Sequence, residues 1–150
     1  MLNHPDASKP LPLLPCACAN LRRAARVVSR IYSEEMAPTG LQMSQYTLLM
    51  VLDYSPNLNQ SALADGLGMD QTTLTRTLSL MLKQGFIRVQ PGEDRRQRLY
   101  QLTPKGAKSL KAGLPYWEKA QARLKSSLGE TKWDTMRGFV HELTALSLKS

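Results

Sequence analysis

Apolar side chains return every three or four positions from residue 17 to residue 32, the spacing that places them on one face of an α-helix. Proline suits the first turn of a helix, so this helix is predicted to begin near Pro15 or Cys16 and to end by Gly40. Prolines recur too densely before it for another helix. Residues 1–14 are therefore expected to form an extended or mobile arm.

Three shorter helical patterns follow, and a residue that can cap a helix precedes each of them. Such side chains accept a hydrogen bond from a free backbone N–H of the first turn. Met43 and Leu48 are spaced as a hydrophobic staple around the first of these helices. Gly68 is placed as a left-handed stop for the second. The predicted helices and their caps are residues 45–54 after Ser44, 60–67 after Asn59, and 71–84 after Asp70.

Two short apolar segments, residues 86–90 and 98–102, are separated by the turn sequence "PGED" and predict a β-hairpin with a tight tip at Pro91 and Gly92. Thr103 and Pro104 then restart a helix as N-cap and first residue. Two amphipathic helices follow, and Pro115 is expected to kink the first of them.

This order of elements predicts a mainly α fold with a small β-hairpin wing. Two short helices joined by a turn and followed by a hairpin describe a winged helix-turn-helix, in which the helix over residues 71–84 is the recognition helix. The amphipathic helices at the two ends predict a dimer, although they would also suit a closed monomeric bundle. The expected divisions are an arm at 1–14, a dimerisation helix at 15–40, a DNA-binding region at 41–103 and C-terminal dimerisation helices at 104–150.

Positive charge is concentrated in the predicted helix-turn-helix and wing. The chain has a net charge of +8, and residues 71–111 alone carry +7. Such a block indicates a polyanionic partner. B-DNA admits one α-helix into its major groove, where side chains that donate and accept hydrogen bonds read the bases. Four residues near the start of the recognition helix meet that need, unless they are merely a solvated polar face: Gln71, Thr72, Thr75 and Arg76. Arg76 suits guanine and Gln71 suits adenine.

The wing carries three arginines within four positions. A wing beside a recognition helix reaches the adjacent minor groove, which attracts arginine over A·T tracts. Asp94 is placed to pair with Arg96 and hold its side chain extended, while Arg95 and Arg98 are placed to reach phosphates. Lys105, near the start of the next helix, adds an expected phosphate contact.

Two segments carry a family resemblance: "QSALADGLGMDQTTLTRTLSLMLKQGFI" at 60–87 and "EDRRQRLYQLTPKG" at 93–106. Together they resemble the MarR family of bacterial transcription regulators. The resemblance implies a homodimer that binds pseudopalindromic operators, usually as a repressor. It also implies dimerisation through the first and the last two helices, and a ligand site between them and the winged region. A small aromatic or phenolic effector is typical of the family. Candidates to line its site are Tyr32, Tyr46, Tyr54, Trp117 and a stripe of Arg22, Arg26 and Arg30.

Cys16 and Cys18 allow two interpretations. They can be small packing residues at a dimer contact, or they can sense an oxidant or a soft metal. A helix N-terminus lowers the pKa of a thiol, which favours the sensor. An internal disulfide two residues apart is strained, so a bond to the partner subunit or to a small thiol is easier to form.

Other classes of function find little support. The chain has no Gly-rich phosphate loop, no cluster of histidines and carboxylates and no nucleophile motif, so neither an enzyme nor a cofactor or metal site is predicted. No apolar run approaches 18 residues, and the segment "LPLLP" lacks the features of a signal peptide. A cytoplasmic location is expected. A winged helix that binds protein or RNA is the remaining alternative.

Overall fold

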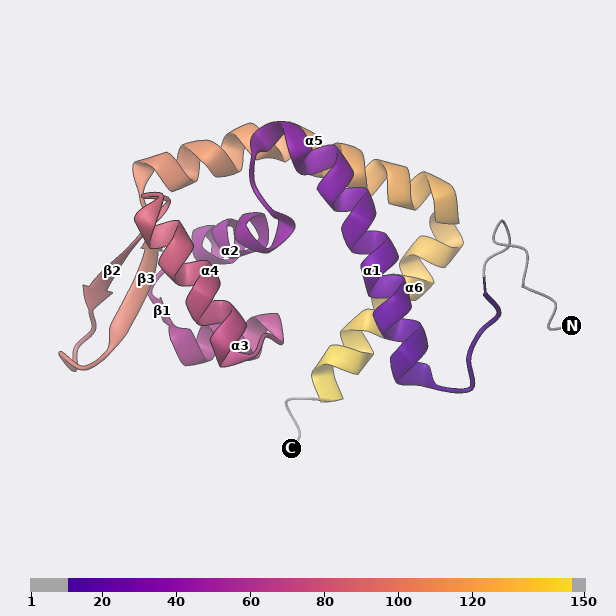
Figure 1. The fold of residues 1–150 in the computed structure, drawn as a ribbon, viewed down its shortest axis with the longest axis horizontal. Helices are drawn as coiled ribbons and strands as arrows, with labels where there is room; N and C mark the ends of the chain where they lie inside the picture. The colour runs from indigo at the N-terminus through magenta and orange to yellow at the C-terminus, as the bar shows by residue number, and fades with distance from the viewer. Residues whose placement is uncertain (1–10, 147–150) are drawn as a thin grey trace, which may run out of the picture.

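The computed structural model describes residues 11–146, and its helices form an arch (Figure 1). The 25-residue helix α5 (Pro104–Leu128) crosses the top of the arch. Below one end lies the winged half, which we define as residues 41–103. Below the other end, α1 (Ala17–Met36) and α6 (Glu130–Ala145) descend and form the outer half. The mainly helical architecture agrees with the prediction.

The N-terminal segment that the structure describes is held against α1. Residues 11–14 are not helical, and the predicted arm at residues 1–10 lies outside the described residues. The side chain of Asn20 binds both the backbone N–H and the carbonyl of Leu14, and the guanidinium of Arg23 donates to the Leu11 carbonyl at 2.7 Å. Cys16 is the N-cap of α1 and makes no side-chain capping hydrogen bond. A short 3₁₀ turn, η1 (Ala37–Thr39), ends α1 before Gly40, whose φ of 70° is left-handed.

The start of α2 (Met43–Tyr54) differs from the prediction. Ser44 does not cap this helix, because the N-cap is Gln42. Its side chain accepts a hydrogen bond from the Gln45 backbone, while the Gln45 side chain accepts one from the Gln42 N–H at 2.9 Å. This reciprocal capping box places Met43 inside the helix rather than before it.

The helix-turn-helix forms as its capping residues predicted. α3 (Gln60–Leu67) is capped by Asn59, whose side chain accepts from the Ala62 N–H at 2.8 Å. Gly68 ends α3 with a left-handed φ of 60°. α4 (Gln71–Lys83) is capped by Asp70, which accepts from the Thr73 N–H at 2.8 Å. The two helices therefore meet across only three residues.

The wing is a three-stranded antiparallel sheet with the order β1-β3-β2. β2 (Ile87–Pro91) pairs with β3 (Arg98–Leu102), and the two-residue β1 (Leu58–Asn59) pairs with the other edge of β3. The sequence pattern did not indicate β1. Pro91 lies opposite Arg98 in the ladder, so the predicted tight tip at Pro91 and Gly92 is wrong. The tip begins after Pro91 and extends to residue 97.

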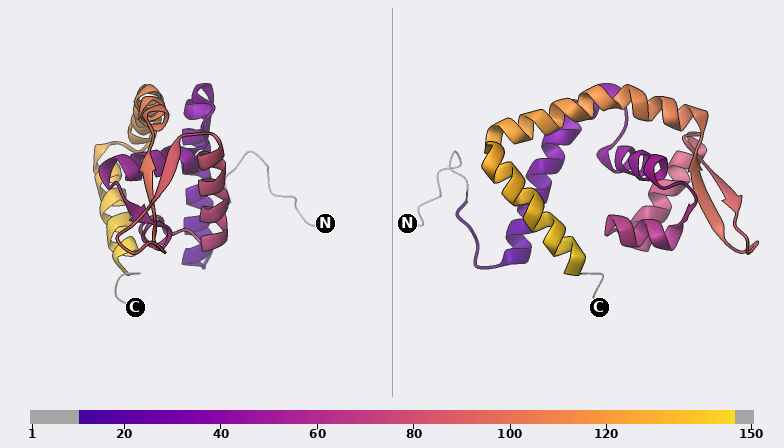
Figure 2. Two further views of the ribbon diagram at one scale, coloured as in Figure 1. Left: turned by 90° about the vertical axis from the view of Figure 1, so that its left-hand side faces the viewer. Right: turned by 180° about the vertical axis from the view of Figure 1, so that it is seen from behind.

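α5 is seated directly on the winged half. Thr103 caps it as predicted, accepting from the Gly106 N–H at 3.1 Å. A side chain at Gly106 would collide with the Phe86 carbonyl, and one at Gly113 would collide with the ring of Tyr46. The helix continues through Pro115, and its path is arched rather than broken (Figure 2).

The buried core lies almost entirely in the winged half. Leucines of α2, α3 and α4 pack together there with Tyr46, Met81 and Ile87. In contrast, no described residue of α6 is buried, and Met36 is the single buried residue of α1. The two halves of the arch therefore differ strongly in how much of their surface is covered.

Candidate nucleic-acid interface

The N-terminal part of α4 presents a polar face to solvent. Gln71, Thr72, Thr75 and Arg76 are all exposed, while Leu74 and Leu78 on the opposite face are buried in the core. Burial of these leucines determines which way the helix faces, because residues three and four apart share one side. The four predicted DNA-contacting residues therefore lie together on the outer surface of the helix.

Gln60, the first residue of α3, contacts this polar face. Its amide nitrogen donates to the Thr75 hydroxyl at 2.6 Å and to the Gln71 side-chain oxygen at 3.2 Å. The Thr75 hydroxyl in turn donates to the Gln71 backbone carbonyl at 2.7 Å. Gln60 is not among the residues that the sequence predicted to contact DNA. A polar first residue on the helix before a recognition helix is the signal that would have indicated it.

The cap of α4 is strong for an exposed site. Asp70 accepts from the Thr73 hydroxyl at 2.6 Å as well as from its backbone N–H. The hydroxyl of Thr73, followed by backbone N–H groups, holds the pKa of Asp70 below its ordinary value. These bonds fix the first turn of α4, where the polar face begins.

The wing tip is organised by Asp94, although not in the way predicted. The Asp94 carboxylate accepts from the backbone N–H of Arg96 at 2.9 Å, and its carbonyl accepts from the Gln97 N–H at 2.8 Å. Among the described residues no ion pair joins Asp94 to the Arg96 guanidinium, so the expected pairing is wrong. Asp94 shapes the backbone of the turn, and Arg95, Arg96 and Arg98 are exposed around it.

The base of the wing is tied to the strand that precedes α3. Asn57 has a positive φ of 68°, and its side-chain oxygen accepts from Gln90 at 2.9 Å and also from Gln101. The guanidinium of Arg88 donates to the oxygen of Gln101 at 3.0 Å. These polar contacts link β2 and β3 to the residue that precedes β1, on the outer face of the sheet.

Lys105 lies at the other end of α4 from the polar face. Its ammonium donates to the carbonyl of Gln84 at 2.6 Å and lies 4.8 Å from the centre of the Phe86 ring. It thus binds a carbonyl at the C-terminal end of the recognition helix. Its predicted phosphate contact stays a prediction.

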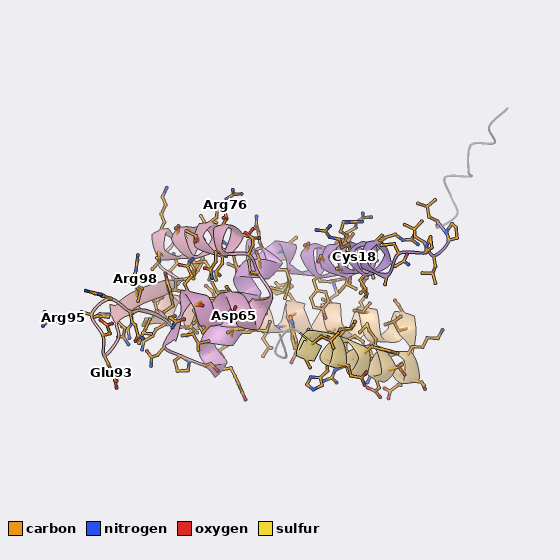
Figure 3. The ribbon with its side chains drawn as sticks, turned by 90° about the horizontal axis from the view of Figure 1, so that it is seen from below. Cys18, Asp65, Arg76, Glu93, Arg95 and Arg98 are labelled. Carbon is orange, nitrogen blue, oxygen red and sulfur yellow. The ribbon has the colours of Figure 1, made fainter. Side chains whose placement is uncertain are left out.

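Seen from below, the polar face and the wing occupy the same half of the molecule (Figure 3). Arg76 projects from α4, and Arg95 and Arg98 extend from the wing at the far end. Cys18 lies on α1 in the outer half. Basic side chains of the winged half are therefore arranged along an extended surface, separate from the cysteines.

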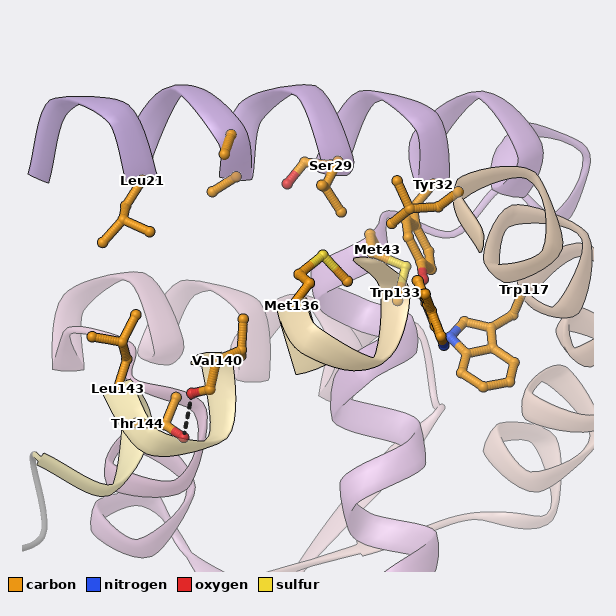
Figure 4. A pocket seen from close by; sticks show the side chains of 14 residues that line it. Leu21, Ser29, Tyr32, Met43, Trp117, Trp133, Met136, Val140, Leu143 and Thr144 are labelled. Carbon is orange, nitrogen blue, oxygen red and sulfur yellow. Dashed lines mark hydrogen bonds between the residues drawn. The ribbon is translucent and has the colours of Figure 1, made fainter. Parts of the chain in front are cut away.

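An apolar groove separates α1 from α6 in the outer half. It has a volume of about 680 Å³, and its walls carry side chains of both helices together with Met43 and Trp117 (Figure 4). Leu21 and Tyr32 of α1 face Met136 and Val140 of α6 across the gap. The Tyr32 hydroxyl donates to Gln121 at 2.6 Å. We call this feature the α1–α6 groove.

The other residues considered for an effector site are dispersed. Tyr46 is fully buried in the winged half, where its hydroxyl donates to the Leu110 carbonyl at 3.1 Å, and Tyr54 is 91% exposed. Neither lines the α1–α6 groove. Only Tyr32 and Trp117 from the earlier candidates do so. Arg22, Arg26 and Arg30 are exposed and do not line it either.

Ion pairs attach the end of α1 to α5. Arg123 binds Glu34 at 2.8 Å and Glu35 at 3.1 Å, and Lys119 binds Glu35 at 3.0 Å. The hydrogen bond from Lys119, assisted by Arg123, lowers the pKa of Glu35. These contacts fasten α1 to α5 beside the groove.

Both thiols, Cys16 and Cys18, are exposed at the start of α1. Within residues 11–146, no three His, Cys, Asp or Glu side chains are grouped so that they could hold a metal ion. Within the same residues, no helix has the length and apolar character needed to cross a membrane.

Two helices joined by a short turn, with a β-wing behind the second, define the winged helix-turn-helix class. The MarR family model matches residues 41–97, which is nearly the whole winged half. The DNA-bound crystal structure of the M. tuberculosis transcriptional regulator MosR is 35% identical, with a TM-score of 0.79 over 89% of this chain and 97% of that one. The chain belongs to the MarR family of transcriptional regulators, as its motifs predicted, rather than to a family of enzymes.

Two further proteins are similar, one to most of the chain and one to part of it. The transcriptional repressor CouR, solved on a 23-mer DNA duplex, is 25% identical with a TM-score of 0.77, over 85% of this chain and 92% of that one. The HTH-type transcriptional regulator YwoH of Bacillus subtilis is 28% identical over 88 residues, which are 59% of this chain. The match spans 64% of YwoH, less than two thirds of its length.

Proposed function

We propose that the protein is a homodimeric repressor that binds pseudopalindromic duplex DNA in the cytoplasm and is released by a small effector. The observation that carries this proposal is the exposed polar face at the start of α4, with the basic wing on the same half of the molecule. MosR, which is similar over most of the chain, was solved in complex with DNA. That likeness supports DNA as the ligand of this surface.

The proposed contacts divide between two grooves of DNA. α4 enters the major groove, where Arg76 donates to guanine and Gln71, Thr72 and Thr75 meet neighbouring base edges. The wing reaches the adjacent minor groove, where Arg96 reads a narrow A·T tract while Arg95 and Arg98 bind phosphates. Asp94 supports these side chains by fixing the backbone of the tip.

The outer half supports a dimer. An isolated chain leaves α6 without a buried residue and exposes Phe139 by 62% and Leu146 by 63%. A second copy that inserts its own terminal helices would cover these apolar side chains and the outer part of the α1–α6 groove. Two recognition helices would then meet half-sites about 34 Å apart on one side of the DNA.

The inner end of the α1–α6 groove suits a small aromatic effector. Tyr32 of α1, Met43 of α2 and Trp117 of α5 meet there beside Trp133 of α6, so aromatic and thioether groups surround this part of the cavity. A ligand at this point would touch both halves of the arch. Binding there would change their relative position and weaken DNA binding.

Binding to the promoter region beside the protein's own gene tests the proposal. We expect tight binding to one duplex, much weaker binding to random duplex, and a steep fall in affinity with salt. A panel of phenols and benzoates should release the complex. Equal affinity for all duplexes, or preference for RNA or for a protein partner, would refute sequence-specific repression.

A second candidate is a thiol-responsive regulator of the same fold, favoured by the exposure of both cysteines. Peroxide would oxidise a thiol to a sulfenic acid and be reduced to water. A thiol of the partner subunit or a small thiol would then displace the sulfenic hydroxyl as water and form a disulfide. The change would press on α1 and displace the two recognition helices. We expect peroxide to weaken operator binding in the parent but not in the Cys16→Ser, Cys18→Ser double variant. Unchanged binding in both would leave effector release as the single mode of control.

A further inference from the structure

Gln60 lies on α3, outside the recognition helix, yet both N–H groups of its amide bind residues of the polar face. One binds the Thr75 hydroxyl and the other binds the Gln71 side-chain oxygen. Gln60 is half-buried, whereas its two partners are exposed. Its position at the first residue of α3 is in turn fixed by the Asn59 cap.

The direction of every hydrogen bond in this cluster follows from the Gln71 backbone carbonyl. A carbonyl oxygen can only accept, so the Thr75 hydroxyl must donate its single proton to the Gln71 carbonyl. Thr75 can therefore only accept from Gln60. The group that Gln60 presents must then be its NH₂, and the Gln71 atom that receives the second N–H must be oxygen.

We infer that Gln60 is a specificity-determining positioning residue, which orients the Gln71 amide so that its NH₂ faces the DNA. This inference rests on the proposed function, in which α4 reads the major groove. With its oxygen held by Gln60, Gln71 presents donors to the bases. Thr75 presents a remaining lone pair and its methyl group.

The consequence is a preference for one chemical class of base. Guanine and thymine offer only acceptors on their major-groove hydrogen-bonding edges, namely N7 and O6 of guanine and O4 of thymine. Adenine and cytosine each present an amino group there, which needs an acceptor. Gln71 is therefore expected to favour a base with a keto group, guanine or thymine. From the sequence alone, Gln71 was expected to bind adenine.

The test exchanges the polarity of the cluster without changing its shape. In Gln60→Glu the amide becomes a carboxylate that only accepts, so the Thr75 hydroxyl must turn its proton from the Gln71 carbonyl to the carboxylate at position 60. Gln71 must likewise turn its NH₂ inward and its oxygen outward. Binding is measured on operator duplexes that carry each of the four base pairs at every half-site position. We expect one position to change from keto to amino preference, by roughly threefold to tenfold in each direction. Gln60→Ala should flatten the preference at that position without reversing it.

Gln97→Glu is the matched control, because it places the same new charge on the wing tip without touching α4. It should weaken binding to every duplex and leave the base preferences at the positions that α4 contacts as in the parent. A Gln60→Glu profile identical to that of Gln97→Glu would overturn the inference, and thermal unfolding would confirm that both variants fold. A parent protein that does not distinguish duplexes would instead overturn the proposed function, and this inference with it.

Discussion

The winged half and the outer half are built from similar amphipathic helices, yet they differ in what covers their apolar faces. In the winged half, α2, α3, α4 and the sheet cover one another, and Leu49, Leu63 and Leu74 have no exposed surface. In the outer half, α1 and α6 line a groove of about 680 Å³ instead of closing on each other. Residues 41–103 therefore form a core within one chain, whereas the apolar faces of α1 and α6 stay largely uncovered.

The largest expected effect comes from charging the groove. Val140→Glu with Leu143→Glu places two carboxylates on the α6 wall of the groove, where a partner helix would have to desolvate them. We expect a monomer in sedimentation velocity and a loss of operator affinity of roughly 100-fold or more, because the second half-site no longer contributes.

Thr135→Glu is the control for this variant, because Thr135 is exposed on α6 and does not line the groove. It should remain dimeric. A monomeric parent, or a charged variant that stays dimeric, would contradict the assignment of the groove to a partner.

Shortening an apolar side chain should affect stability differently in the two halves. Leu74→Ala removes a fully buried side chain and should reduce the free energy of unfolding by about 2–5 kcal/mol. Leu143 is 43% exposed, and Leu143→Ala should have an effect that varies with protein concentration. Urea denaturation at two concentrations measures both. If Leu74→Ala lowered the free energy of unfolding less than Leu143→Ala does, the winged half would not hold the main core.

Arg76→Ala tests the polar face directly. The loss of a bidentate contact should cost about 1–3 kcal/mol in operator binding and relax base preference at one position per half-site. Fluorescence anisotropy with operator and random duplexes makes the measurement. Equal weakening on both duplexes would assign Arg76 to phosphate.

The wing should contribute less. Arg96→Ala should cost about 1 kcal/mol, the upper range for an exposed ion pair, and should reduce preference for A·T-rich flanks. Asp94→Ala should act in the same direction but more weakly, because it loosens the tip. Asp94→Asn is the control, since its amide oxygen can still accept from the Arg96 N–H. Parent-like binding in both alanine variants would place the wing outside the groove.

The smallest expected effect is on the pH dependence of stability. The pKa of Asp70 in the folded protein lies below its ordinary value. The ionised cap therefore stabilises the fold fully when the pH is above the ordinary pKa of an aspartate. This stabilisation is lost as the pH falls through the lower pKa of the folded state. Asp70→Asn should unfold with a weaker dependence on pH at the acidic end of this window. Thermal unfolding between neutral and strongly acidic pH measures the difference, and identical curves would show that the cap does not titrate with folding.

Features that depend on neighbours in sequence were predicted well, and those that depend on distant partners were not. Asn59, Asp70 and Thr103 each cap the helix that follows, because the cap involves only the next three residues. Ser44 had the right chemistry for a cap, but Gln42 and Gln45 form a capping box that starts the helix two residues earlier.

The missed features cross between elements. β1 has only two residues and forms because it pairs with the free edge of β3. The local sequence around β1 does not indicate this pairing. Gln60 acts on a different helix, eleven residues away at Gln71. Asp94 was placed correctly at the tip, but a short carboxylate reached the nearest backbone N–H before any guanidinium.

The seating of α5 has a mechanical consequence. Gly106 and Gly113 bring this helix against Phe86 and Tyr46 without intervening side chains, so its first part is packed directly on the winged half. Its far part carries α6. Pro115 lies between them, about 16 Å along the helix from its start. In the dimer that we propose, a change of bend there would move the two α4 helices relative to each other. The half-site separation that the proposed dimer accepts would thus depend on α5, a helix outside the proposed base contacts.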